Sequence, residues 1–134
     1  MATEYIVDQN GERKRVILPV EEYERLKEAA EEGEKMRRHP GIVFTGTGEL
    51  RRATLVRSVF DVWEVVDLYK DKGRERLFSE HPISEEQLET ALSYYEAYSE
   101  EVDAIIEEND QPLEYWRKKY PDLKISVTEI GEAE

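Results

Sequence analysis

Two marked helix starts constrain the fold of this 134-residue chain more than any other sequence feature. Asp61 and Glu64 have the spacing of a capping box, and Ser84 and Gln87 repeat it. Apolar residues recur at helical spacing behind both boxes, so we expect two long helices, with a short helix around Leu77 between them. Apolar pairs at the positions of a hydrophobic staple flank the boxes: Phe60 with Val65, and Ile83 with Leu88.

The first 38 residues predict a β-hairpin followed by a helix. Short apolar runs lie on both sides of Asn10-Gly11, a dipeptide that is typical of tight hairpin turns. Pro19 stands where a first helical turn tolerates proline, and apolar residues recur at helical spacing from Val20 to about Arg38. The sequence His39-Pro40-Gly41 then stops the helix and marks a boundary.

The remaining signals complete an α+β prediction. Residues 42–56 read as a second hairpin around Gly46-Thr47-Gly48, and a short helix around Trp116 is followed by a strand-like alternation. We therefore expect an N-terminal β-hairpin plus helix, then a mainly helical body with a helix-turn-helix of the three-helix, homeodomain-like type. The expected segments are residues 1–38, residues 39–108 and a C-terminal partner-binding or docking segment at 109–134.

Charge is divided unevenly along the chain. Residues 1–60 carry equal numbers of acidic and basic side chains, whereas residues 61–134 carry eight basic and 21 acidic ones, so the whole net charge of −13 lies there. This favours a basic protein over nucleic acid as the partner of the second part. The chain has no cysteine, and no apolar run approaches the roughly 20 residues that cross a bilayer. We expect a cytoplasmic protein that does not enter membranes.

Several motifs between His39 and Ile106 resemble a known family. The chain has a histidine-proline-glycine start, a valine-tryptophan helix and a histidine-proline helix start, the pattern of the domain-of-unknown-function family four-three-three. This resemblance implies a helix-turn-helix antitoxin, similar in role to VapB-type antitoxins, whose cognate partner is a toxin of PIN-like nuclease fold. It rests on His39, Pro40, Gly41, Val62, Trp63, His81, Pro82, Ile83, Ser84, Gln87, Leu88, Ala91, Leu92 and Tyr94.

The opening segment carries a second resemblance. The run YIVDQNGERKRVILPVEEYERL, from Tyr5 to Leu26, is similar to the openings of Phd/YefM- and RelB-like antitoxins. In those proteins a hairpin and helix build a dimer. The resemblance therefore implies a homodimer, with residues 1–38 as its dimerisation element.

Six cations are the candidate DNA contacts, because strands as well as helices can enter a groove of operator DNA. The alternative reading is an ordinary solvated face. The expected recognition helix begins with Glu85, Glu86 and Glu89, which phosphates would repel, and the simpler role of these acids is to stabilise the helix N-terminus. The cations are Arg13, Lys14 and Arg15 on the first hairpin and Arg51, Arg52 and Arg57 around the second.

The C-terminal segment is the candidate toxin-binding element. Large aromatic anchors followed by an added strand commonly fill a groove on a partner, although such residues can equally pack on their own domain. Arg117, Lys118 and Lys119 beside them suit the carboxylate cluster of a PIN-like nuclease by opposite charge. The candidate residues are Tyr115, Trp116, Tyr120, Leu123, Ile125 and Val127.

The sequence offers little for catalysis, and we predict neither catalytic residues, metal ligands nor a cofactor. His39 and His81 both precede proline at helix boundaries, where turn or capping roles are the simpler interpretation. The function that we expect is that of an antitoxin of a type II toxin-antitoxin system. It would bind and neutralise the toxin, with autoregulation of its operon if it also binds DNA. The alternatives are a DNA-binding transcriptional regulator without a toxin and, more remotely, an enzyme.

Overall fold

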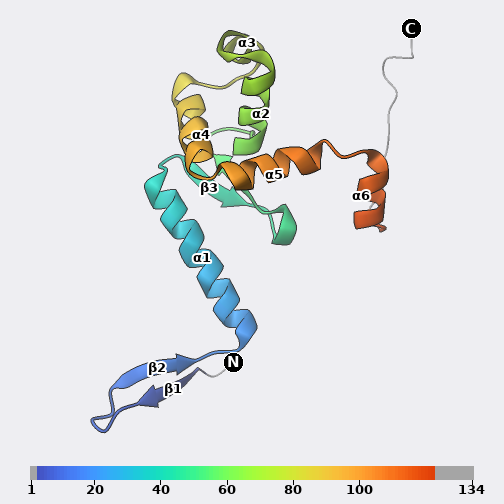
Figure 1. The fold of residues 1–134 in the computed structure, drawn as a ribbon. Coiled ribbons are helices and arrows are strands. Elements are labelled where there is room, and N and C mark those ends of the chain that lie inside the picture. The colour runs from blue at the N-terminus through green and yellow to red at the C-terminus, as the bar shows by residue number, and fades with distance from the viewer. Residues whose placement is uncertain (1–2, 123–134) are drawn as a thin grey trace.

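The computed structural model describes residues 3–122, and it confirms the α+β class with an N-terminal hairpin (Figure 1). The strands form two separate two-stranded antiparallel sheets. The strands are β1 (Glu4–Val7), β2 (Arg13–Ile17), β3 (Ile42–Thr45) and β4 (Arg52–Leu55). The helices are α1 (Val20–Arg38), α2 (Val62–Lys72), α3 (Arg74–Glu80), α4 (Glu85–Ala97), α5 (Ser99–Asn109) and α6 (Leu113–Lys119), and a 3-10 turn, η1, spans Gly48–Leu50.

The first hairpin forms where the sequence predicts it, but its connection is longer than a two-residue turn. The carboxylate of Asp8 accepts hydrogen bonds from the backbone N–H groups of Asn10 and Glu12, at 2.8 and 2.9 Å. Gly11 adopts the positive φ of 79° that the turn requires. A register shift between Ile6 and Val7 gives β2 an extra residue, because the side-chain bonds of Asp8 compete with a tight turn.

The second hairpin supplies three residues to the core. Ile42, Ala53 and Leu55 are buried on one face of β3 and β4, and the helices cover that face. The outer face carries Thr45 and Thr54, whose hydroxyl groups are 2.7 Å apart. The two strands pair without a shift from Ile42 with Leu55 to Thr45 with Arg52.

Helices α2 and α4 begin where the two capping boxes predict. The backbone N–H of Asp61 donates to the Glu64 carboxylate at 2.9 Å, and Asp61 is the N-cap of α2. Ser84 caps α4: its hydroxyl accepts from the N–H of Gln87 at 3.0 Å, and the Gln87 side chain accepts from the Ser84 N–H at 2.9 Å. Ser99 does not cap a helix: Tyr98 is the N-cap of α5, and Ser99 lies inside its first turn.

This difference between the two serines gives a testable prediction. We expect Ser84→Ala to lower the free energy of unfolding by about 1 kcal/mol, because a helix donor loses its partner. Ser99→Ala is the matched control, since no capping hydrogen bond is made there, and it should change stability by less than about 0.5 kcal/mol. Urea denaturation of both variants measures the difference, and equal effects would contradict the capping role.

The hydrophobic core belongs to the middle of the chain. All the buried apolar residues in the described part lie between Ile42 and Val102, on β3, β4, α2, α3, α4, α5 and the turn before α4. Helix α2 is central, since it packs against α3, α4, α5 and β4. We call this unit the body. The expected segment boundaries at residues 38 and 108 stay predictions, but the core lies between them.

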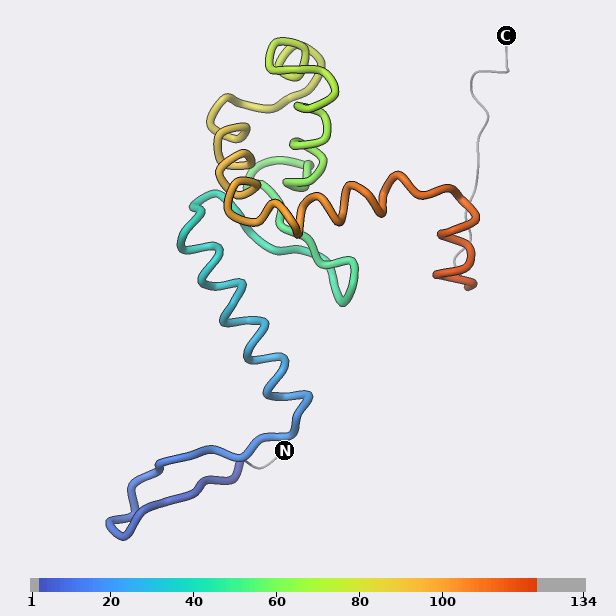
Figure 2. The backbone as a smooth tube through the Cα atoms, viewed as in Figure 1, coloured from blue at the N-terminus to red at the C-terminus, as the bar shows by residue number. Residues whose placement is uncertain are grey.

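Two segments project from the body (Figure 2). The first, which we call the arm, consists of β1, β2 and α1, and only the C-terminal end of α1 reaches the body (Figure 1). The second is α6, which lies beyond the far end of α5 and touches the body at η1, where the Tyr120 hydroxyl donates to the Glu49 carboxylate at 3.3 Å (Figure 1). The arm and α6 therefore leave the body in different directions.

Candidate protein-interaction site

The arm carries most of the exposed apolar surface of the described chain. Neither strand of its hairpin buries a residue, and α1 buries none over its 19 residues. An isolated two-stranded hairpin is only marginally stable in water, so such an element normally gains stability from a partner. Nine of the 13 large apolar residues that the described part of the chain exposes lie here: Tyr5, Ile6, Val7, Val16, Ile17, Val20, Tyr23, Leu26 and Met36.

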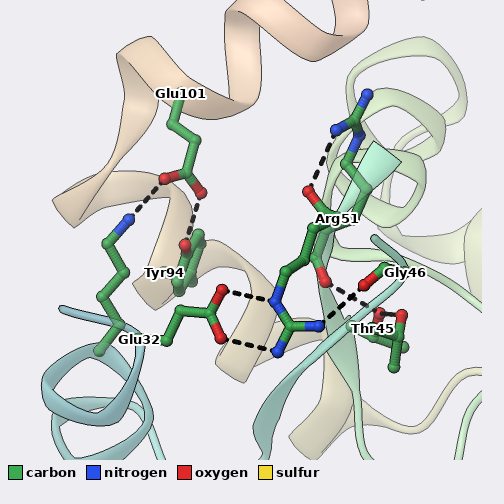
Figure 3. A network of polar contacts seen from close by, with 9 residues as sticks. Glu32, Thr45, Gly46, Arg51, Tyr94 and Glu101 are labelled. Atoms are coloured by element: carbon green, nitrogen blue, oxygen red, sulfur yellow. Dashed lines mark hydrogen bonds and ion pairs between the residues drawn. The ribbon is translucent and has the colours of Figure 1, made fainter. Parts of the chain in front are cut away.

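The arm is fastened to the body by two ion pairs near the end of α1. Arg51 faces Glu32 in Figure 3, and its guanidinium group donates two hydrogen bonds to the Glu32 carboxylate, at 2.6 and 2.7 Å. The Lys35 amine donates to the Glu101 carboxylate on α5 at 2.6 Å, and it also lies 4.7 Å from the centre of the Tyr98 ring. These contacts set the direction in which α1 leaves the body.

Tyr94 connects this attachment to the core. Its side chain is fully buried, and its hydroxyl donates to the second carboxylate oxygen of Glu101 at 2.5 Å (Figure 3). Burial, together with this hydrogen bond, raises the pKa of the Tyr94 hydroxyl well above its ordinary value. The hydroxyl is therefore a neutral donor at any physiological pH, and it orients Glu101 toward Lys35.

Sequence reasoning missed this attachment. Glu32 and Lys35 stand three residues apart on one face of a helix, which resembles any solvated charged surface. Their partners lie 19 and 66 residues further along the chain. No local sequence signal connects groups at such distances, so only the tertiary structure could reveal these pairs.

Helix α6 gathers the described aromatic residues of the C-terminal segment. Tyr115, Trp116 and Tyr120 are half-buried, and the rings of Trp116 and Tyr120 stack with their centres 6.1 Å apart. The Lys119 amine lies within about 6 Å of all three ring centres, in the range of cation–π attraction. The other candidate partner-binding residues, Leu123, Ile125 and Val127, and the strand predicted there, lie outside the described residues.

Only two of the three cations on α6 are left exposed. Lys119 is bound by the Glu108 carboxylate at the end of α5, and Glu108 also accepts the Tyr115 hydroxyl at 2.7 Å. Arg117 and Lys118 are exposed, with no ion pair to any residue in the described range. Lys119 thus attaches α6 to its own chain, whereas Arg117 and Lys118 are exposed and their role in binding a partner stays a prediction.

The attachment of α6 should depend on pH through Glu108. Lys119, followed by Tyr115, lowers the pKa of this carboxyl below its ordinary value of 4.5. A lowered carboxyl pKa stabilises the attached state above pH 4.5, and that contribution is lost as the pH falls through the lowered value. In a Trp63→Phe background, Trp116 fluorescence should therefore change below pH 4.5. Glu108→Gln should abolish the transition, and its persistence in that variant would contradict this assignment.

The six candidate DNA contacts lie in three separate places. Arg13, Lys14 and Arg15 lie together on β2 at the far end of the arm, with the Arg13 guanidinium 4.0 Å from the centre of the Tyr5 ring. Arg51 is held by Glu32, and Arg52 donates to the backbone oxygen of Glu49 at 2.5 Å. Arg57 lies in the loop after β4 with a positive φ of 62°. These cations do not form one basic surface.

The start of α4 bears acids, as the sequence indicates. Glu85, Glu86 and Glu89 are all exposed, and Arg74 on α3 pairs with Glu85. With Ser84 at the N-cap, Glu85 and Glu86 occupy the first turn, where carboxylates stabilise the helix dipole. The structure gives this helix end a local stabilising role.

The two histidines lie in different packing environments. The His39 ring packs edge-on against the rings of Tyr94 and Tyr98, both at 5.5 Å, and its Nδ1 is 3.3 Å from the Ser93 hydroxyl. The His81 ring packs against Phe60 at 5.8 Å. Within residues 3–122, no group of three or more histidine, aspartate or glutamate side chains is arranged to hold a metal ion.

No helix in the described range is both long and apolar enough to span a bilayer. The described residues form a small α+β structure with one hydrophobic core and two segments that project from it.

Comparison with known proteins found no relative: no protein-family model, curated protein or solved structure matches the chain.

Proposed function

We propose that this protein is an antitoxin of a type II toxin-antitoxin system, which binds and neutralises a nuclease toxin of PIN-like fold. One observation carries the proposal: nine of the 13 large apolar residues that the described part of the chain exposes lie on the arm, and α6 adds half-buried aromatic side chains outside the core. Aromatic and apolar residues that gather on projecting segments are typical of protein-binding surfaces. The resemblances between His39 and Ile106 and between Tyr5 and Leu26 supply the class of partner.

Helix α6 is the proposed inhibitory segment. Trp116 and Tyr120 provide large rigid anchors, and Arg117 and Lys118 provide exposed positive charge beside them. A PIN-like nuclease acts through a cluster of carboxylates, which these two cations complement. Binding there would neutralise the toxin by covering its active site in a stoichiometric complex.

The acidic second half of the chain supports the same reading. Residues 61–134 carry the whole net charge of −13, and a nuclease presents positive charge to its substrate backbone. An acidic surface would compete with nucleic acid for that positive charge and would accelerate association at low salt.

Co-expression with the protein encoded by the adjacent reading frame tests the proposal. That protein alone should arrest growth, and the full chain should relieve the arrest and co-purify with it. A chain ending at Asp110 retains every core residue, since the last one is Val102, yet it should lose the complex. Failure of the full chain to relieve the arrest or to co-purify would overturn the antitoxin proposal.

Charge-reversal variants locate the inhibitory contact. Arg117→Glu with Lys118→Glu should weaken the complex at least tenfold, because both cations face the toxin's carboxylates. Arg37→Glu with Arg38→Glu is the control, since it reverses an exposed adjacent pair on α1, where both arginines pair with Glu34. Equal affinities for the two double variants would move the interface away from α6.

A second activity, autoregulation through operator DNA, is favoured by one observation. Arg13, Lys14 and Arg15 are consecutive and exposed on β2. A regulator that contacts phosphates there would bind DNA with a strong salt dependence. Arg51→Ala should have little effect on such binding, because that guanidinium is already held by Glu32. We propose that the protein acts as a homodimer in either role.

A further inference from the structure

We infer that a hollow between the body and α6 binds the guanidinium group of an arginine from a basic partner protein. The hollow has a volume of about 240 Å³, and residues of η1, β4, α2 with its N-cap, α5 and α6 line it. The inference goes beyond the proposed function, because it does not require the partner to be a nuclease. The lining residues are Leu50, Arg52, Asp61, Trp63, Ile105, Glu108, Asn109 and Trp116.

Both tryptophans of the chain line this hollow, although they belong to different helices, α2 and α6. The Trp63 indole N–H donates to the Asp61 carboxylate at 3.2 Å, so the N-cap of α2 orients this ring. The Trp116 ring stacks on the ring of Tyr120, within α6. Two indole rings are thus presented to one hollow from opposite parts of the sequence.

Two aliphatic residues complete the apolar part of the lining. Leu50 is 59% exposed, and Ile105 is half-buried, so the structure leaves both partly in water. Sites that enclose a whole small molecule usually have volumes of roughly 300–1,000 Å³, and this hollow is smaller. It therefore fits a single side chain of a partner better than a free small molecule.

Charge selects a cation as the occupant. The lining contains two carboxylates, those of Asp61 and Glu108, and one guanidinium group, that of Arg52. Most of the lining belongs to residues 61–134, which carry the whole net charge of −13. The faces of indole rings also attract cations, through the ring quadrupole. An anion would be repelled by both the carboxylates and the ring faces.

The lining also offers hydrogen-bond acceptors that the described chain does not use. The hydrogen bonds that Glu108 accepts from Lys119 and Tyr115 both end on its Oε2 atom, and its Oε1 atom accepts none within residues 3–122. The Asn109 side chain beside it is exposed. A guanidinium group carries five N–H donors in one plane. It can therefore stack on an indole ring and donate to these oxygen atoms at the same time.

Arginine fits this hollow better than lysine. The Lys119 amine already lies 5.9 Å from the centre of the Trp116 ring, so this ring has a cation near it within the chain itself. A second ammonium group would have to give up strong hydration, whereas a guanidinium group is planar, more weakly hydrated and stacks on aromatic rings. Arginine is also enriched among the residues that dominate the binding energy of protein interfaces.

Arg52 is the lining residue that opposes a cation. Its guanidinium group donates to the backbone oxygens of Glu49 and Arg51, at 2.5 and 3.1 Å. Its charge adds to the lowering of the Glu108 pKa that Lys119 causes, so it acts on a carboxylate that the incoming arginine would meet. Removal of this charge should therefore strengthen the binding of a cation.

Tryptophan fluorescence reports binding directly, because both tryptophans of the chain line the hollow. The full chain is titrated with N-acetyl-arginine amide at constant ionic strength, and its emission should change in a saturable way. N-acetyl-citrulline amide is the matched probe, since an uncharged urea group of nearly the same shape replaces the guanidinium group. It should bind roughly tenfold more weakly. Neither titration needs a toxin, so failure here is distinct from failure of the proposed function.

An aromatic substitution tests the location of the site. Trp63→Leu should weaken binding of the arginine probe roughly tenfold, because one of the two rings is lost while Trp116 still reports. Tyr23→Leu is the control, since it removes an exposed aromatic ring on the arm, and it should leave binding unchanged. The far-ultraviolet signal of the helices checks that both variants fold.

A charge substitution on the strand tests the sign of the ligand and does not depend on the folding of the Trp63 variant. Arg52→Gln should strengthen binding of the arginine probe severalfold, because the rival cation is removed. Arg57→Gln is the control, since Arg57 is exposed and does not line this hollow. It should bind the probe as the unchanged chain does.

Three results would overturn the inference. The first is equal binding of the arginine and citrulline probes, since the hollow would then select shape and not charge. The second is an equal response of Arg52→Gln and Arg57→Gln, or weaker binding to Arg52→Gln, since the probe would then not meet the charge of Arg52 as a rival. The third is an unchanged tryptophan emission up to the solubility limit of the arginine probe.

Discussion

Replacing Leu88 with alanine should lower the free energy of unfolding by about 2–5 kcal/mol, the largest single-residue effect that we expect. Leu88 is fully buried on α4, within the core formed by α2, α3, α4, α5 and the second hairpin. The substitution removes apolar contacts and leaves a cavity that the surrounding helices can fill only in part. Urea denaturation, followed by the far-ultraviolet signal of the helices, measures the loss.

Leu50→Ala is the control for this prediction. Leu50 lies at the end of η1 and is 59% exposed. Its truncation should change stability by less than about 0.5 kcal/mol, as is usual for surface sites. If the two leucine variants were equally stable, the assignment of α4 to the core would be wrong.

Gly46→Ala should be the second large effect, with a loss of about 2 kcal/mol or more. Gly46 has a φ of 91°, and a side chain added there would begin 2.6 Å from the backbone oxygen of Leu50. That oxygen belongs to the backbone, so it cannot rotate away as a flexible side chain would. The carbonyl of Gly46 also accepts a hydrogen bond from Arg51 at 2.8 Å (Figure 3).

Gly48→Ala is the control that separates backbone strain from the steric clash. Gly48 also has a positive φ, of 56°, but nothing lies within 4 Å of the added atom. It should therefore cost only the backbone strain, about 1 kcal/mol. Thermal unfolding of both variants gives the comparison, and a loss at Gly48 as large as that at Gly46 would refute the clash.

The relative effects of Lys35 and Arg51 also follow from the geometry of the attachment. Both fasten the arm, but the Glu101 carboxylate that Lys35 binds is also held by the buried Tyr94 hydroxyl, whereas the Glu32 carboxylate is bound by Arg51. The direction of the arm should therefore depend more on Lys35. A displaced arm would present its exposed apolar residues in a different direction from the body.

Local sequence chemistry determined the starts of α2 and α4 and the breaks between elements. Ser84 and Gln87 satisfy each other's backbone groups within one turn, so the information is contained in four consecutive residues. Pro40 and Gly41 end α1 for equally local reasons. A serine near a helix start is not by itself sufficient: Tyr98 takes the cap position of α5, and Ser99 lies inside the first turn.

The sequence also determined which side chains were candidates for binding, but it could not decide their surroundings. Arg51 and Arg52 read as two adjacent cations near a turn. Nothing local shows that Glu32 binds Arg51. Likewise, the sequence offers Arg117, Lys118 and Lys119 as equals. Only the fold brings Glu108 to Lys119 and leaves the other two in water.

The arm shows most plainly where sequence reasoning ends. Its apolar periodicity determined a hairpin and an amphipathic helix, because period and turn chemistry are encoded locally. Whether those apolar faces are buried depends on whether the rest of the chain folds into a surface that packs against them. The tertiary structure decided this: α2 and its neighbours complete one another's core without the arm. Tyr23 and Leu26 were thus left exposed to water.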